Sequence, residues 1–281
     1  MSAVDNLFAS KSEIYHTGKV ITYPCGIVDI LVSTHLDFRP PGWEPVTYER
    51  YKPALLNDDG KTVRKCADPK QEDLIRSMRR ARSKVRRIAL SNDFKYFVTL
   101  TLDGAKVDRY DMAEIVKKLN YWADNQVRRK GLRYVLVPER HKDGAIHFHG
   151  FFNDALPVVD SGVLDVPWSK KPLRPKDEKT RSEWIEKGGR IIYNLPTWTL
   201  GFTTAIEVYG EYPRAVSYVC KYIGKQGEKP AGRWYYSGGD LREPEVLFTD
   251  LEYDQIMEQY GDKAFPVRGV HHPMAVVLGV E

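Results

Sequence analysis

The chain has 281 residues and a formal net charge of +5, with 42% hydrophobic and 29% charged residues. These proportions are typical of a folded globular protein and exclude a disordered or fibrous chain. The first residues lack a basic start followed by an apolar stretch, and no run approaches the 18 apolar residues of a membrane span. We therefore expect a cytoplasmic protein without a membrane partner.

The three cysteines are widely separated and include no C-x-x-C pair. Cys25, Cys66 and Cys220 therefore predict neither a disulfide framework nor a thiolate zinc site. Such a set fits a reducing compartment best.

The N-terminal part contains a predicted strand at residues 26–34 and then a strongly basic segment at residues 65–87. An Asp68-Pro69 start and acidic residues in the first turn predict a helix over residues 69–90. Its basic residues are compatible with a solvated helical face or with phosphate contacts. They are Lys65, Lys70, Arg76, Arg79, Arg80, Arg82, Lys84, Arg86 and Arg87.

The middle of the chain predicts a strand at residues 96–102 and an amphipathic helix at residues 111–129 that Gly131 ends. Two further strands, residues 132–138 and 145–152, are joined by the turn HKDG. This order predicts an α+β fold in which a central antiparallel β-sheet is flanked by helices.

The remaining chain is harder to interpret. Residues 153–198 are rich in proline, glycine and charge and have the character of an insertion. A strand at residues 199–209 and a helix at residues 213–225, ended by Gly227, follow it. We expect an N-terminal segment (1–94), a core (95–226) and a C-terminal extension (227–281).

His147 and His149 flank one apolar residue in a predicted strand, so their side chains point to the same face. The hairpin brings Glu139, at the end of the preceding strand, beside them. Two nitrogens and one oxygen suit Mg²⁺ or Mn²⁺ acting on a phosphate. An H-x-H pair alone is more often structural, and His141 in the turn is better explained as a solvated loop residue than as a fourth ligand.

The predicted helix at residues 213–225 has one apolar face and one face with two phenols and two amines. Tyr218, Lys221, Tyr222 and Lys225 fall within an arc of about 100°. A tyrosine is a poor nucleophile unless cations or a base stabilise the phenolate, and we expect the two lysines to do so. Taken alone, the pattern also fits tyrosines at the edge of the core and solvated lysines.

Three motifs together resemble those of the HUH (His-hydrophobic-His) replication initiators. They are FVTLTLD at residues 97–103, Glu139 followed by HFHG at residues 147–150, and YVCKYIGK at residues 218–225. The third is similar to the two-tyrosine initiators typified by the gene A proteins of small single-stranded-DNA phages. The resemblance implies a Rep nuclease core with an RRM-like sheet.

The resemblance also implies the chemistry. His147, His149 and Glu139 would hold a divalent metal, Mg²⁺ or Mn²⁺. One of Tyr218 and Tyr222 would attack a phosphate to give a 5′-phosphotyrosine and a free 3′ hydroxyl primer, and the other would make the closing cleavage. Lys221 and Lys225 would assist.

The implied substrate is single-stranded DNA at a replication origin of a phage or plasmid in a bacterial host. No G-x-x-x-x-G-K-[ST] motif occurs, so unwinding is expected from a host helicase, with a DNA polymerase extending the primer. A single-tyrosine relaxase or transposase is an alternative, as is a non-catalytic protein that binds single-stranded or origin DNA. A metal-free RNA-binding protein fits less well, because Phe148 points away from the two histidines.

Overall fold

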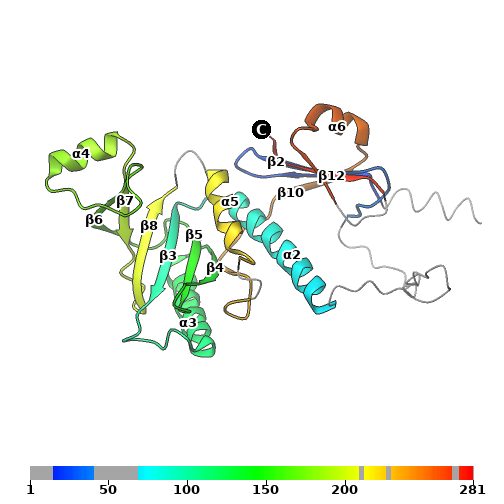
Figure 1. Cartoon of the computed structure of the whole chain (residues 1–281). Coiled ribbons are helices and arrows are strands. Elements are labelled where there is room, and N and C mark those ends of the chain that lie inside the picture. Colours follow the sequence, from blue (N-terminus) through cyan, green and yellow to red (C-terminus); the bar gives the residue numbers. More distant parts are fainter. Residues whose placement is uncertain (1–14, 41–68, 209–211, 226–228, 268–271, 281) are drawn as a thin grey trace, which may run out of the picture. The chain divides into compact units, whose positions relative to one another are not determined.

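The computed structural model describes residues 15–40, 69–208, 212–225, 229–267 and 272–280. The chain forms two compact units. The larger unit comprises residues 73–243, and the smaller unit comprises residues 1–72 and 244–281. Figure 1 labels their helices and strands.

The larger unit is built on a seven-stranded sheet with the order β6-β7-β8-β3-β5-β4-β9, in which every neighbouring pair is antiparallel. The strands are β3 (Tyr96–Leu102), β4 (Tyr134–Arg140), β5 (Ile146–Phe152), β6 (Val159–Asp165), β7 (Arg190–Asn194), β8 (Gly201–Glu207) and β9 (Tyr236–Gly238). The predicted hairpin is the β4–β5 pair of this sheet. The predicted α+β class with a central antiparallel sheet is confirmed.

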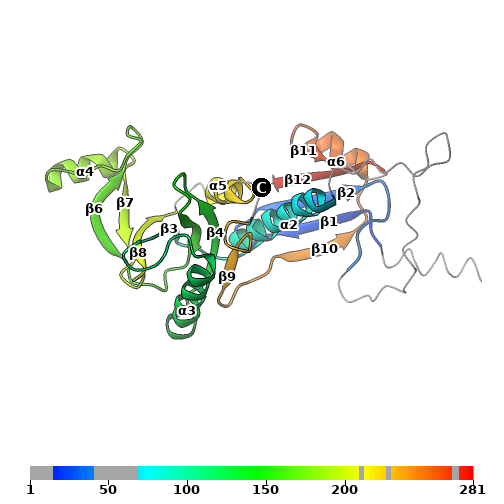
Figure 2. The same ribbon diagram turned by 60° about the horizontal axis from the view of Figure 1, so that its bottom comes forward.

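One face of this sheet is covered by helix α3, Met112–Lys130 (Figure 2). Apolar residues at helical spacing on α3 bury themselves against alternate residues of the strands, which forms the main core. Asp111 caps the helix by accepting hydrogen bonds from two backbone amides, and Gly131 ends it in the left-handed conformation with φ 71°. Both ends lie within one residue of the predicted helix.

The insertion at residues 153–198 extends the sheet. It supplies β6, helix α4 (Glu178–Glu186) and β7, and β7 pairs with β8. Figure 1 shows α4 at the end of the sheet that lies away from helix α5. The insertion therefore enlarges the sheet at one edge.

Helix α2 (Pro69–Ser91) lies against helix α5 (Tyr212–Tyr222) within the larger unit. Arg82 donates from Nε and Nη2 to the carbonyl of Ile223 at 3.0 and 2.7 Å. Helix α5 stops earlier than the predicted residue 225, because Gly224 adopts φ +76° next to the Met78 side chain. The predicted stop at Gly227 was therefore wrong by one turn.

The basic residues of α2 have more than one role. Arg82 binds the end of α5, and Lys84 forms an ion pair with Glu243 at 2.5 Å. Arg76, Arg79 and Arg80 are exposed. Part of the basic segment is thus structural, and its exposed arginines keep the alternative of phosphate contacts open.

Replacing Arg82 with methionine is expected to lower the free energy of unfolding by about 1–3 kcal/mol, because a partly buried carbonyl loses both donors of a charged group. Urea denaturation followed by circular dichroism measures the change. Arg80→Met, at an exposed position of the same helix, is the matched control. Equal losses in the two variants would show that the Ile223 contact does not stabilise the protein.

The smaller unit is a five-stranded sheet with the order β10-β1-β2-β12-β11 and one helix, α6 (Tyr253–Tyr260). Its strands are β1 (Gly18–Thr22), β2 (Val28–Ser33), β10 (Glu245–Thr249), β11 (Ala264–Pro266) and β12 (Met274–Val280). Buried Asp29 joins the two ends of the chain, because it accepts bonds from Tyr23 and from the backbone of Gly279, both at 2.9 Å.

This pairing divides the chain differently from the three consecutive segments that the sequence suggests. Strand β1 pairs with β10, and β2 pairs with β12, so the N-terminal segment and most of the C-terminal extension form one sheet. The predicted strand at residues 26–34 is β2. Strand pairing over more than 200 residues leaves no local pattern in a sequence.

Candidate active site

The two histidines of β5 lie on the face of the sheet opposite α3. Their neighbour Phe148 is fully buried on the α3 face. The Nδ1 atom of His149 lies 3.1 Å from the Thr99 hydroxyl, and the Nδ1 atom of His147 lies 3.2 Å from the Thr101 hydroxyl. Each ring is thus oriented from β3, which leaves its Nε2 atom as the outer nitrogen.

Glu139 of β4 joins this face, as the hairpin predicts. Its Cα pairs with that of His147, and its Oε2 atom lies 3.0 Å from Nε2 of His149. Its Oε1 atom accepts a hydrogen bond from Nζ of Lys225 at 2.6 Å. The carboxylate therefore connects a strand histidine to the segment that follows α5.

Burial keeps both imidazoles in the neutral form. Desolvation lowers the pKa of His149 to about 4, although the nearby Glu139 carboxylate acts in the opposite direction. Desolvation also lowers the pKa of His147, with a contribution from His141. A neutral imidazole offers the lone pair that binds a metal ion.

The two tyrosines of α5 lie against the same face. The Tyr222 ring stacks on the His149 ring, with centroids 4.5 Å apart and an angle of 10°. Its hydroxyl donates to the Tyr218 hydroxyl at 2.5 Å. Tyr218 is 50% exposed and packs its ring edge-on against Phe97.

The predicted help from the lysines is not present in this arrangement. Lys225 lies beyond the end of α5, and its ammonium group binds Glu139. Lys221 is exposed and forms no hydrogen bond or ion pair within the described part of the chain. Burial, together with the Tyr218 hydroxyl, raises the pKa of Tyr222. The phenol is therefore protonated at rest, contrary to the expectation from helical spacing.

The side chains fit a divalent metal by their chemistry without yet forming a site. Across the described ranges, no three His, Cys, Asp or Glu side chains are arranged to hold a metal ion. The rings of His147 and His149 are 6.4 Å apart, and Glu139 is engaged by Lys225. The donor set of two Nε2 atoms and one carboxylate, with both rings oriented by threonines, is suitable for a hard or borderline cation.

The sequence interpretation overlooked three residues of this face. Thr99 and Thr101 orient the histidines, and Phe202 of β8 lies in register with Thr101. The alternation in FVTLTL places both threonines on one face. Their partners become visible only once the pairing of β3 with β5 is known.

His141 lies near the histidine pair but is turned toward another group. Its ring stacks on that of His147 with centroids 5.0 Å apart, and its Nδ1 atom lies 3.3 Å from Asp143. Its side chain is 59% exposed. This is consistent with a loop histidine beside the site.

A comparison with protein families gives one match for this part of the chain. Residues 95–227 match the model of a family described as Replication-associated protein ORF2. The matched segment starts directly before β3 and ends shortly after Lys225, so it contains all the residues of the histidine face and of α5 described above. The predicted resemblance to rolling-circle replication proteins is thereby confirmed at the level of the family.

The other comparisons add little. Neither the curated proteins nor the solved structures include a match to the chain. None of the described helices is long and apolar enough to cross a membrane. Cys25 and Cys220 are free thiols, and burial raises the pKa of Cys220 to about 11; Cys66 lies outside the described residues.

Proposed function

We propose that the protein initiates rolling-circle DNA replication as a site-specific endonuclease and strand transferase for single-stranded DNA. The observation that carries this proposal is the juxtaposition of two tyrosine hydroxyls, 2.5 Å apart, with the ring of one stacked on His149. Two nucleophiles this close can act in turn on a phosphate at one position. The match to a replication-associated family supports the same conclusion.

The proposed step is a transesterification. A tyrosine oxygen forms a bond to phosphorus while the bond from phosphorus to the 3′ oxygen breaks. The phenolic proton leaves to solvent, which reaches the half-exposed Tyr218, and the departing 3′ oxygen takes up a proton from water. The product is a 5′-phosphotyrosine and a 3′ hydroxyl, and no oxidant or nucleotide is consumed.

We infer that His147, His149 and Glu139 hold Mg²⁺ or Mn²⁺. When bound, the ion polarises the scissile phosphate. The chain itself orients both rings through Thr99 and Thr101 and keeps them neutral by burial. Transfer of Glu139 from Lys225 to the ion would free the ammonium group beside Tyr222, whose ring centroid lies 5.5 Å from Nζ.

The open part of the histidine face suits a DNA strand. Phe202 is 68% exposed on β8, although it occupies the middle of a sheet, and Thr204 on the same strand is also exposed. An exposed aromatic ring on a sheet offers a stacking surface for a base. We therefore place one base of the bound strand on Phe202.

Phe202→Ala is expected to weaken binding of a single-stranded oligonucleotide about 5- to 100-fold, since stacking of one base contributes about 1–3 kcal/mol. Fluorescence anisotropy in EDTA measures this without cleavage. Tyr121→Ala, at a 74% exposed aromatic residue on α3, is the matched control. Equal affinities of Phe202→Ala and the unmodified protein would exclude a base on this ring.

The central test is covalent capture of DNA. We expect labelled oligonucleotides tiled from the replicon to form an adduct that survives denaturing electrophoresis, with Mn²⁺ or Mg²⁺ and not with EDTA. Tyr218→Phe and Tyr222→Phe should each retain an adduct, and the double variant should lose it, because either hydroxyl reaches the same phosphate.

Other outcomes would change the assignment. Loss of the adduct in one single variant alone would favour a single-tyrosine relaxase or transposase. DNA binding without any adduct would favour an origin-binding protein that does not cleave. The host helicase and DNA polymerase are proposed as partners because the nick supplies a primer and the sequence has no P-loop.

A further inference from the structure

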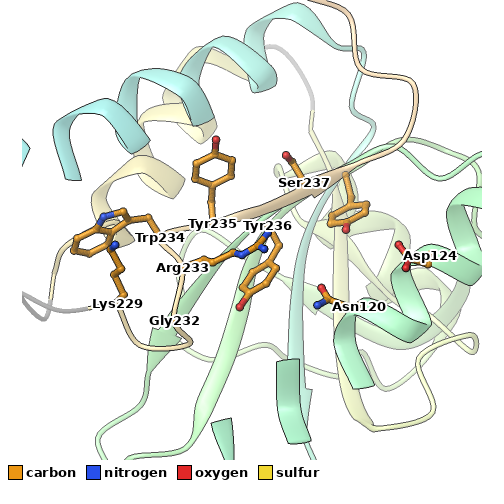
Figure 3. A pocket seen from close by; sticks show the side chains of 10 residues that line it. Asn120, Asp124, Lys229, Gly232, Arg233, Trp234, Tyr235, Tyr236 and Ser237 are labelled. Atoms are coloured by element: carbon orange, nitrogen blue, oxygen red, sulfur yellow. The ribbon is translucent and has the colours of Figure 1, made fainter. Parts of the chain in front are cut away.

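A second feature of the larger unit is a hollow beside the edge strand β9 (Figure 3). It encloses about 600 Å³ between α3, the start of β4 and the segment of residues 229–237. A space of this size is within the range of sites for small ligands.

The hollow lies on the face of the sheet opposite the histidines. Tyr134 of β4 pairs with Phe152 of β5, and both belong to the core under α3. Tyr236 of β9 packs in the same core. The hollow is therefore separate from the candidate active site.

Two cations form one side of the hollow, and each lies over a buried aromatic ring. The Arg233 guanidinium lies 5.9 Å from the centroid of Tyr236, and Nζ of Lys229 lies 6.0 Å from that of Trp234. The Tyr236 hydroxyl is fixed to the carbonyl of Ala231, and the Trp234 indole donates to Ser77 at 3.0 Å. Fixed rings thus hold the cations in place while the charged groups remain exposed.

Hydrogen-bonding side chains form the other side. Asn120 and Asp124 are four residues apart on α3, so they share one face of the helix, and Figure 3 shows them across from Arg233. Within the described residues, Asn120, Asp124, Lys229 and Arg233 form no side-chain hydrogen bond or ion pair. A carboxylate and a guanidinium that face one space without bonding each other suit a ligand with complementary groups at both ends.

We propose that this hollow binds one guanine nucleotide unit. Guanine is the base whose pairing edge offers two adjacent N–H donors, N1 and N2, which match the two oxygens of Asp124, while its O6 accepts from the Asn120 amide. The nucleotide phosphate binds Arg233, with Lys229 adding positive charge. Adenine and cytosine offer one amino group each, and thymine a single N–H, so a carboxylate discriminates against them.

The same chemistry is available from a free nucleotide or from a guanosine within a DNA strand. Isothermal titration calorimetry of the full chain in EDTA, with dGMP, dAMP, dCMP and dTMP, tests the first source. Titration with a thymidine nonamer, and with the same nonamer carrying one central guanosine, tests the second. We expect the guanine ligand to bind at least about tenfold more tightly than its counterparts in one or both series.

Matched variants identify the site. Asp124→Asn and Arg233→Gln are expected to weaken guanine binding at least about tenfold, whereas Asp240→Asn and Arg129→Gln, at exposed positions outside the hollow, leave it unchanged. Thermal melting verifies that all four fold.

Each outcome has a definite meaning. Preference within the mononucleotides alone assigns a free-nucleotide site, and preference within the nonamers alone assigns a contact to a DNA strand. Absence of guanine preference in both series, or binding unaffected by Asp124→Asn, overturns the proposal. Adduct formation at the tyrosines does not depend on either result.

Discussion

His149→Ala is expected to abolish Mn²⁺ binding and to lower adduct formation at least about 100-fold. The substitution removes one nitrogen donor, the contact with Glu139 and the surface on which Tyr222 stacks. Changes in residues that only orient metal ligands typically cost about 10- to 100-fold, and loss of a ligand should cost more. Electron paramagnetic resonance of free Mn²⁺ measures binding independently of cleavage.

His147→Ala should reproduce the loss of Mn²⁺ binding, although Tyr222 does not stack on this ring. His141→Ala is the matched control, because His141 lies beside His147 but is largely exposed and bonded to Asp143. We expect it to change affinity less than about threefold. A similar loss in all three variants would make His141 a ligand, and unchanged Mn²⁺ binding in His149→Ala would refute the metal assignment.

Much of the larger unit could be predicted from local patterns. The strand β3, the capped helix α3 and the β4–β5 hairpin each depend on alternation, capping residues or a short turn. The hairpin was sufficient to bring Glu139 to the histidines. The sheet edges and the smaller unit could not be predicted, because β1–β10 and β2–β12 join segments from the two ends of the chain.

The tyrosine helix shows where sequence patterns stop being informative. Helical spacing placed Tyr218 and Tyr222 on one face correctly, but it treated Lys225 as part of the same helix. Gly224 ends the helix first, and Lys225 then reaches Glu139. Electrostatic effects on a tyrosine depend on which partner a lysine selects, and that choice is decided by contacts between distant segments.

Gly150→Ala is expected to destabilise the larger unit by about 3 kcal/mol or more. Gly150 pairs with Leu136 in the β4–β5 ladder, and a Cβ atom there would lie 1.9 Å from the backbone oxygen of Val135. A backbone oxygen cannot move aside as a flexible side chain would, so β4 must shift. Urea denaturation followed by circular dichroism measures the loss of stability.

Gly104→Ala provides the matched control. Its added Cβ would meet only the Arg109 side chain, at 3.4 Å, and we expect a change within about 0.5 kcal/mol. Because β4 carries Glu139 and β5 carries His149, the shift that relieves the clash at Gly150 also separates the carboxylate from the imidazole. Any folded fraction of Gly150→Ala should therefore bind Mn²⁺ more weakly than Gly104→Ala, whereas equal stability and equal Mn²⁺ affinity would show that the two strands tolerate the displacement. The close approach of β4 to β5 at this glycine thus links the stability of the sheet to the geometry of the site.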